Sequence, residues 1–222
     1  MNVNDSKLIN RILMYILGLF ILALGVAFSI NSQLGVSPVN SLPYVISLIT
    51  GQDMGKVVIC VFSFYILLQL LILRKEFKWI NLTQLIFSTI FGYFVDFAKY
   101  LLGDFTLPTY GGQLVMMAIG IILIALGISL YMNAGLINMP MEGFTEAVSK
   151  KVFKKLTFQD VKVIIDCLVV GIGIILSWLF LGRIEGIREG TVLSALLVGL
   201  IMKKFQKVIE PLMNKALGTE EL

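Results

Sequence analysis

Six apolar segments, each about as long as a membrane helix, limit what this chain can fold into. A helix needs about 20 predominantly apolar residues to cross the hydrocarbon core of a bilayer, where all backbone polar groups must be paired internally. The six segments are Ile12–Ile30, Lys56–Leu73, Leu82–Leu102, Gln113–Met132, Val161–Leu181 and Gly190–Ile209. The sequence therefore predicts an all-α polytopic membrane protein with one membrane domain over residues 1–222.

Composition agrees with a lipid bilayer as the main partner. The chain is 58% hydrophobic and 14% charged, whereas soluble domains are about 45–50% apolar and about 25% charged. Its net charge of +4 comes from Lys and Arg residues grouped between apolar segments, a pattern typical of membrane topology. We therefore expect no nucleic-acid partner. The polar residues 1–11 lead directly into a segment longer than a signal-peptide core, so we expect Ile12–Ile30 to be retained as the first membrane helix.

The chain also contains an internal repeat. The stretch Leu24–Pro38 aligns without a gap to Leu126–Pro140, and polar and helix-breaking residues coincide. The matched pairs are Gly18/Gly120, Gly25/Gly127, Asn31/Asn133, Leu34/Leu136 and Pro38/Pro140. We predict one repeat over residues 12–102, a second over 113–209, and a short cytoplasmic tail over 210–222.

Each copy of the repeated motif is followed by a short stretch that is poorly suited to crossing a membrane. Pro38–Thr50 and Pro140–Phe153 are too short or too polar, and each opens with proline, a favoured first residue of a helix. If both are re-entrant, the lysine-rich runs near residues 74–78, 150–155 and 203–207 all face the cytoplasm, as the positive-inside rule favours. We therefore predict six spanning helices, two re-entrant half-helices and both termini in the cytoplasm.

Three full spans per repeat, an odd number, make the second copy enter the membrane from the opposite side. The repeats are then inverted and related by a pseudo-two-fold axis in the membrane plane. Many transporters use this plan and place their substrate site near the midplane, where broken helices meet.

Asn31 and Asn133 are the first candidates for a substrate site, because each is predicted where a span ends and a re-entrant segment begins. Irregular backbone at membrane depth persists only when it is buried in protein or lines a wet cavity. Both amides are therefore candidates for lining a central site. Equally, a repeated turn needs a repeated cap, and each Asn side chain is able to bond freed backbone groups in its own turn.

The predicted N-termini of the two short helices are the second candidate. Unpaired N–H groups and a partial positive charge there favour an anionic ligand group. Ser37 and Asn40 lie at the first of these ends, and Asn138 and Glu142 at the second. Glu142, which matches Asn40, places a carboxylate at the positive end. Three roles are open for this carboxylate: it caps the helix, it binds a coupling cation, or it makes the site select cations.

Ionisable residues inside spans are functional candidates, because burying them is costly. Asp166 is predicted about two turns into its helix, with no basic residue directly beside it in the sequence. Glu146 follows Glu142 on one face of the second short helix. We assign a proton or cation coupling role to Asp166 or Glu146, with an interfacial carboxylate as the alternative for Asp166. Asp96 and Lys99 are expected to form a partly solvated surface pair.

Enzymatic activity is not expected. The sequence has no hydrolase elbow, P-loop or metal-ligand spacing, and it contains no histidine. We therefore predict neither a cofactor nor a metal.

The stretch LGVAFSINSQLGVSPVNSLPYVIS and the glycine-rich spans around it resemble bacterial YczE/YitT-type integral membrane proteins. This resemblance covers most of the chain and implies a protein of the bacterial cytoplasmic membrane, in a family to which transport has been attributed. It implies no particular site residues.

The function that we predict from these features is transport of a small polar or anionic solute by alternating access. Three alternatives stay open: a channel, a substrate-capture subunit of a larger complex with an energising partner, and a membrane scaffold. Assembly into a homo-oligomer is equally compatible with the sequence.

Overall fold

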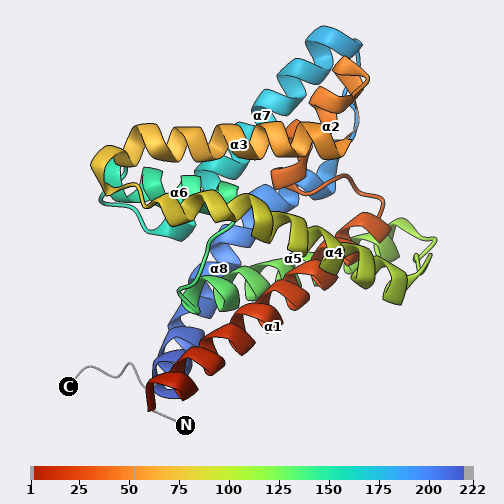
Figure 1. Ribbon diagram of the computed structural model, residues 1–222. Coiled ribbons are helices and arrows are strands. Elements are labelled where there is room, and N and C mark those ends of the chain that lie inside the picture. The colour runs from red at the N-terminus through yellow and green to blue at the C-terminus, as the bar shows by residue number, and fades with distance from the viewer. Residues whose placement is uncertain (1–2, 53, 218–222) are drawn as a thin grey trace.

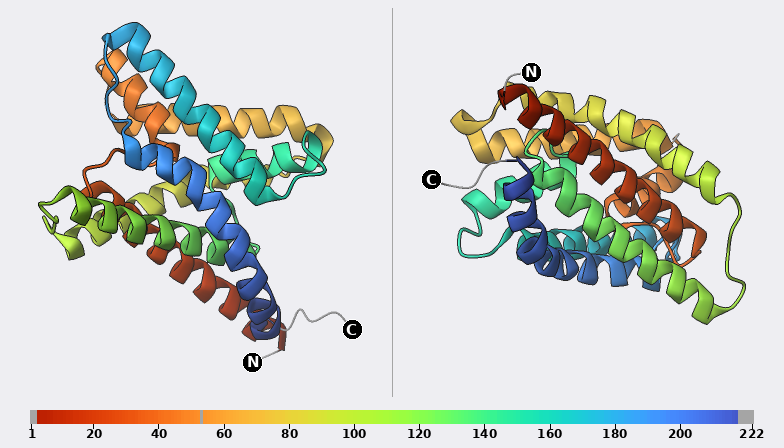
Figure 2. Two further views of the ribbon diagram at one scale, coloured as in Figure 1. Left: turned by 180° about the vertical axis from the view of Figure 1, so that it is seen from behind. Right: turned by 90° about the horizontal axis from the view of Figure 1, so that it is seen from below.

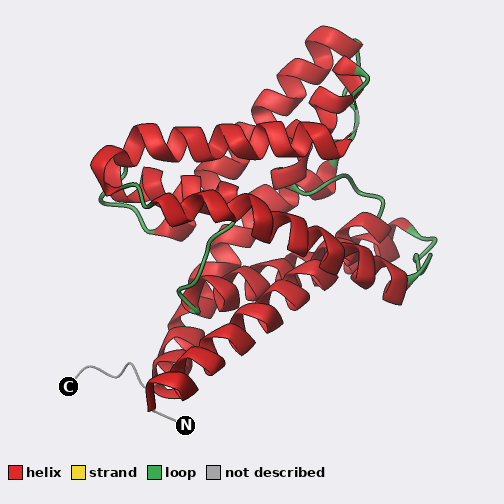
Figure 3. Ribbon diagram, viewed as in Figure 1, coloured by secondary structure: helices red, strands yellow, loops and turns green. Residues whose placement is uncertain are grey.

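The computed structural model describes residues 3–52 and 54–217, and within these ranges it consists of helices and connecting loops (Figures 1 and 3). The α-helices are α1 (Val3–Asn31), α2 (Pro38–Thr50), α3 (Met54–Leu73), α4 (Gln84–Leu102), α5 (Tyr110–Asn133), α6 (Pro140–Lys151), α7 (Phe158–Leu181) and α8 (Glu189–Leu217). Two short 3₁₀ helices, η1 (Arg74–Glu76) and η2 (Trp79–Thr83), connect α3 to α4. The all-helical prediction is confirmed.

Five helical segments of the described chain are long and apolar enough to cross a membrane. They are Leu8–Asn31, Met54–Glu76, Trp79–Leu102, Tyr110–Asn133 and Phe158–Leu181, and they coincide with the first five predicted spans. The sixth predicted span, Gly190–Ile209, lies in α8 and is not among these five, because the apolar first half of this helix is followed by Lys203, Lys204 and Lys207. The helix continues to Leu217, so the first part of the predicted tail extends α8, and residues 218–222 lie outside the described ranges. The protein is a polytopic helical membrane protein.

The two short helices begin inside the protein and end at its surface. Pro38 and Ser41 in the first turn of α2 are buried, as are Pro140 and Glu142 in the first turn of α6. The helices contain 13 and 12 residues. At 1.5 Å per residue they are about 18–20 Å long, well short of the roughly 30 Å hydrocarbon core. Their lengths and buried N-terminal ends support the prediction that they are re-entrant.

The helices pack as two four-helix groups, and each repeat contributes two helices to each group. We call α1, α4, α5 and α8 the first bundle, and α2, α3, α6 and α7 the second bundle. Figure 1 shows most of the second bundle above the first. The bundles meet where α7 of the second packs along α8 of the first. In the two repeats α1 to α4 correspond to α5 to α8, in that order. The α2–α7 contact thus corresponds to the α6–α3 contact, and the α1–α4 contact to the α5–α8 contact. The packing within each bundle is thus repeated, whereas the extensive α7–α8 contact has only a small counterpart in α3–α4.

The closest contact between the repeats is that of α1 with α5, which lie side by side and antiparallel (Figure 2). Glycines from the matched pairs allow the two backbones to touch. A Cβ atom at Gly25 would lie 2.6 Å from the Ile124 backbone nitrogen, and one at Gly127 would lie 2.5 Å from that of Leu22. These glycines are therefore needed for close helix packing, as in other membrane bundles.

Replacing Gly127 with valine is expected to force α1 and α5 apart. The loss of stability should reach or exceed the roughly 1–3 kcal/mol that is typical of overpacked cores, because backbone atoms rather than side chains are displaced. Gly171→Val in α7 is the matched control, since nothing lies within 4 Å of a Cβ at that position. Thermal unfolding in detergent should show a clear drop in the midpoint for Gly127→Val alone. Equal midpoints for the two variants would contradict the close α1–α5 contact.

Candidate functional site

Two hollows lie between the first and second bundles. The central cavity has a volume of about 440 Å³ and is lined by all eight α-helices or their adjoining loops. Its exposed lining residues, among them Ile30, Gly55 and Asp96, mark a mouth near the C-terminal ends of α1 and α4 and the start of α3. The vestibule, of about 800 Å³, lies among the α3–α4 connection, the α5–α6 connection and α6.

The first turns of α2 and α6 both border the central cavity. Ser37 and Asn40 line it from α2 and the residue before it, and Met139 and Glu142 line it from the corresponding places at α6. Proline at the first position of each helix fits there because the first turn has no intrahelical acceptor for its N–H groups. Each helix end therefore contributes a partial positive charge of roughly half a unit beside the cavity.

Three buried charged side chains form one wall of the cavity, and we call them the charge cluster. The Lys162 ammonium lies 3.4 Å from Glu142 Oε1 and 3.2 Å from Asp166 Oδ2. All three side chains are at most 4% exposed. One ammonium thus faces two carboxylates, out of contact with bulk water.

Two tyrosines surround the charge cluster. The buried Tyr65 hydroxyl has electrostatic contact with Asp166 and Glu142, and the fully buried Tyr131 ring brings its hydroxyl close to Glu142. Among the described residues, neither hydroxyl completes a hydrogen bond in good geometry. Burying an ion pair seldom stabilises a fold, because the lost hydration offsets the attraction between the charges. A buried cluster with unequal charge is therefore better explained by function.

The charge cluster belongs to the second repeat alone. Asn40 is the third residue of α2, as Glu142 is of α6. Val58 and Phe62 on α3 have the same four-residue spacing as Lys162 and Asp166 on α7, and all line the cavity. The cavity is thus formed by corresponding positions of both repeats, with charged side chains on one side and polar or apolar ones on the other.

The first bundle contributes a largely apolar wall with a few polar side chains. Ser194 of α8 lines the cavity, is fully buried and has no hydrogen-bond partner in the part of the chain that the structure describes. Ser88 of α4 lines it too, but its hydroxyl donates to the Gln84 carbonyl. Buried hydroxyls normally have partners, so Ser194 offers an unused hydrogen-bonding group to a bound molecule.

A side-chain amide pair lines the vestibule and bonds the start of α6, whose first turn borders the central cavity. Gln69 Nε2 donates to Gln84 Oε1 at 3.0 Å and to the Pro140 carbonyl at 3.0 Å, and Gln84 Nε2 donates back to Gln69 Oε1 at 3.1 Å. Gly143 lets α6 approach this pair, since a Cβ there would lie 2.7 Å from Gln69 Oε1. Gln69 belongs to the second bundle and Gln84 to the first, so the pair also joins the bundles.

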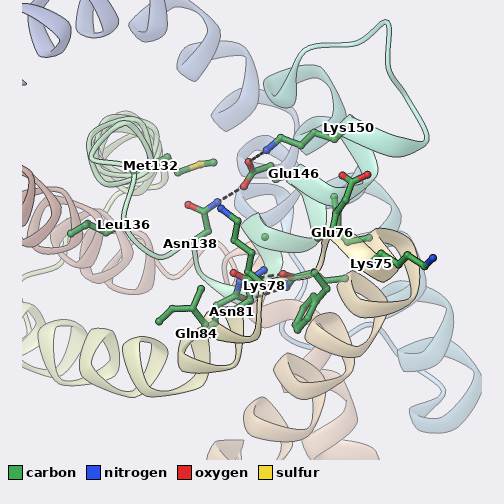
Figure 4. Close-up of a pocket in the computed structure, with 17 residues that line it drawn as sticks. Lys75, Glu76, Lys78, Asn81, Gln84, Met132, Leu136, Asn138, Glu146 and Lys150 are labelled. Carbon is green, nitrogen blue, oxygen red and sulfur yellow. Dashed lines mark hydrogen bonds and ion pairs between the residues drawn. The ribbon is translucent and has the colours of Figure 1, made fainter. Parts of the chain in front are cut away.

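The vestibule has a basic wall (Figure 4). Lys75, Lys78 and Lys150 line it, and Lys150 Nζ pairs with Glu146 Oε1 at 2.5 Å. Asn138 Nδ2 donates to the other Glu146 oxygen at 2.5 Å. Asn138 and Glu146, two of the predicted site residues, thus interact with each other in the vestibule and do not line the central cavity.

Four predicted site residues line the central cavity: Ser37, Asn40, Glu142 and Asp166. Asn31 and Asn133 point elsewhere. Asn31 Nδ2 donates to the carbonyls of Gly103 and Phe105 at 3.0 and 3.1 Å, and so ties the end of α1 to the α4–α5 loop. Asn133 exchanges hydrogen bonds with Gln206 and ties α5 to α8. Neither amide lines the central cavity, and both connect their helix to another element rather than only capping their own turn.

Lys162 is the main residue that sequence reasoning missed. The sequence analysis looked for a basic partner of Asp166 only among the residues directly beside it in the sequence, whereas residues four apart share a helix face. That spacing would have identified Lys162. Asp96 was expected in a surface pair with Lys99 but instead lines the cavity mouth. The Gln69–Gln84 pair joins two different helices, and no local sequence pattern predicts it.

Comparison with known proteins gives a family and no activity. A family model described as a family of unknown function (DUF6198) matches residues 9–207. The uncharacterized membrane protein YczE of Bacillus subtilis (strain 168) is 28% identical over 199 residues, which cover 89% of this chain and 86% of that protein. The uncharacterized protein YyaS of the same organism is 26% identical over 197 residues, covering 88% and 92%. No solved structure gives a significant match. The resemblance to YczE-like proteins is confirmed.

Replacing Lys162 with methionine is expected to destabilise the protein strongly, because two buried carboxylates lose the cation that contacts both of them. Removing one partner from a buried ion pair costs about 3–5 kcal/mol. The triple variant Glu142→Gln, Lys162→Met and Asp166→Leu should recover most of this loss, because no uncompensated charge is left. Thermal unfolding midpoints in detergent measure both effects.

Lys203→Met is the control for this experiment. It breaks the more exposed pair with Asp160, which should be worth less than about 1 kcal/mol. If Lys162→Met were no less stable than Lys203→Met, Lys162 would not balance the carboxylates of the cluster.

Proposed function

The chain belongs to the DUF6198 family, and we propose that this member is a membrane transporter that carries a small polar or anionic solute by alternating access. The observation that carries the proposal is the position of the charge cluster. It lies in a cavity between two bundles that opens at one end of the molecule, while a second hollow at the other end is lined by the Gln69–Gln84 pair, which bonds the start of α6. The solute site is the central cavity.

The size and chemistry of the cavity support a small-molecule site. Its volume of about 440 Å³ falls within the roughly 300–1,000 Å³ range of ligand pockets. It combines apolar walls with a few convergent polar groups, namely the charge cluster, Asn40 and Ser194. Ionisable residues inside a membrane domain commonly mark solute or proton pathways.

The packing between the bundles supports a rocking motion. The α7–α8 contact is the most extensive one between bundles, whereas α3–α4, α4–α6 and α2–α8 touch over few residues. We propose that the bundles pivot along α7 and α8. Breaking the Gln69–Gln84 pair would then open the cavity to the vestibule, and closing the mouth would seal the other side.

The proposed location is the bacterial cytoplasmic membrane, with both termini in the cytoplasm. The lysine-rich runs that surround the vestibule support this orientation through the positive-inside rule. The central cavity then opens toward the outside in the present structure, and the vestibule faces the cytoplasm.

Single cysteines at Asn40 and Asn138, each in a background lacking Cys60 and Cys167, test this function. An impermeant thiol reagent outside intact cells should label the cavity cysteine at 40 and leave the vestibule cysteine at 138 unmodified. In inverted vesicles, position 138 should react quickly and position 40 slowly, because position 40 becomes accessible only after the bundles have rocked.

Each alternative function predicts a different result. Equal labelling of position 40 from both sides, together with an ion current in liposomes, would indicate a channel. Protection of position 40 from both sides would indicate a scaffold. If solute uptake required a co-purifying ATPase, the chain would be a capture subunit. Solute uptake by the chain alone in liposomes would exclude that function.

A further inference from the structure

We propose that the central cavity binds a small anionic solute together with one proton: Lys162 and the N-termini of α2 and α6 hold the anionic group, and Asp166 carries the proton. This inference rests on the transport function proposed above. It specifies the class of solute and the coupling ion of the same site.

The first argument is charge balance within the cluster. Glu142 and Asp166 share one ammonium, so the fully ionised cluster has a formal charge of −1 in a buried site. An uncompensated buried charge costs several kcal/mol, and protonation is the usual way in which a carboxyl group avoids that cost. A metal cation is a poorer solution, because Lys162 already occupies the place between the two carboxylates.

Asp166 is the better carrier of the proton. Glu142 is in the first turn of α6, where the partial positive charge of the helix end stabilises an ionised carboxylate. Asp166 is at the ninth position of α7, far from either end of that helix, and its nearest cation is Lys162, one turn earlier. A proton on Asp166 leaves Glu142 and Lys162 as a neutral pair.

The groups around Asp166 do not supply a second cation. Glu142 faces it from α6 and Tyr65 from α3, while Asp96 of α4 lies at the cavity mouth. The elements α2 and α8 contribute the uncharged Asn40 and Ser194 to the cavity wall, and Tyr131 of α5 lies beside Glu142. Protonation of Asp166 is therefore what changes the charge of this wall.

Lys162 retains the capacity to bind a further acceptor. Its ammonium has three donors and lies 3.2–3.4 Å from its two partners. Charge-assisted hydrogen bonds of good geometry are about 2.7–2.9 Å long, so both existing contacts are loose. Asp166 Oδ1 also lies 3.3 Å from the same nitrogen, so three oxygens share the ammonium at long distances. An anionic group that entered from the cavity would make a shorter contact and compete with these oxygens for the donors.

The helix ends and Ser194 complete the anion site. Two N-termini with roughly half a positive charge each border the cavity, an arrangement that inverted-repeat transporters use for anionic substrate groups. Ser194 is a second, independent indication of a ligand, because its buried hydroxyl lines the same cavity without a partner in the described chain. The helix ends favour an anion over a cation, and the Ser194 hydroxyl is able to donate a hydrogen bond to the anion.

The proton and the anion depend on each other. With Asp166 ionised, an entering anion adds a third negative charge around a single ammonium. With Asp166 protonated, the anion meets a neutral Glu142–Lys162 pair and two positive helix ends. One proton therefore enters with each anion, and for a monoanion the loaded carrier moves no net charge.

Binding measurements on purified protein test this coupling. Glycolate, glutamate, inorganic phosphate and choline serve as probes, and the rise in the thermal unfolding midpoint reports binding. The anionic probes should stabilise the protein and choline should not. At pH values at which Asp166 is mostly ionised, the apparent dissociation constant of the anion should rise tenfold per pH unit, because one proton is bound with each anion.

Asp166→Asn resembles the protonated side chain permanently. It should retain anion binding with no dependence on pH, whereas a merely structural role would not predict retained binding. Lys162→Gln should lose binding at every pH. Glu185→Gln, which neutralises a carboxylate in a surface pair with Arg183, is the matched control and should keep the wild-type slope.

Infrared difference spectra against pH provide an independent measurement. The wild type should show the C=O band of one buried protonated carboxyl group, and Asp166→Asn should lack it while Glu185→Gln keeps it. A missing band in the wild type, a wild-type pH slope in Asp166→Asn, stabilisation by choline alone, or stabilisation by none of the probes would overturn the proposal. The sided labelling of positions 40 and 138 is unaffected by these outcomes, so the transport function is tested separately.

Discussion

A helix that begins inside a protein leaves up to four N–H groups without intrahelical partners, and the arrangement at the centre of this molecule depends on that constraint. The N-terminal ends of α2 and α6 are buried, and both border the central cavity. In lipid such ends would be prohibitively costly, so they must be enclosed by protein or must line a polar space. The other six α-helices provide that enclosure.

The same constraint explains why the charges lie where they do. The positive end of α6 stabilises the Glu142 carboxylate in its first turn, and Asp166 reaches the same wall through Lys162, which contacts both carboxylates. Lys162 then balances one of the two carboxylates. This arrangement is asymmetric, because the first repeat contributes Asn40, Val58 and Phe62 to the corresponding wall. A symmetric backbone thus carries a site that only the second repeat makes charged.

The elements of this fold followed from the sequence because their signals are local. Proline at positions 38 and 140 marked the starts of α2 and α6, and matched glycines in α1 and α5 revealed the repeat. The apolar stretches predicted the spans. The point at which α8 stops being apolar is also a local feature of the sequence, because Lys203 and the lysines that follow it make the second half of the helix polar.

The site was only partly accessible to the same reasoning. Asn40, Glu142 and Asp166 were identified because polar residues at a helix start or inside a span are unusual. Asn31 and Asn133 carried an equally strong signal, yet they bond loop and helix atoms. A matched pair of amides serves a repeated turn as well as a binding site, and only tertiary contacts distinguish the two.

The contacts that close the site could not be predicted at all. Gln69 and Gln84 lie on different helices, and their pairing depends on the angle at which α3 meets α4 and on the space left by Gly143. Helix packing of this kind is decided by the whole bundle. Local pattern thus predicts which helices form and which residues are unusual, whereas the partners of those residues follow from tertiary structure.

Distances between spin labels across the two hollows test the rocking of the bundles most directly. A pair at Met54 and Gly92 spans the mouth of the central cavity, and a pair at Met132 and Lys150 spans the vestibule; each pair joins the two bundles. The account predicts two distance populations for each pair, which shift in opposite directions when pH or solute changes. A single, unchanging distance for both pairs, or distances that lengthen together, would contradict it.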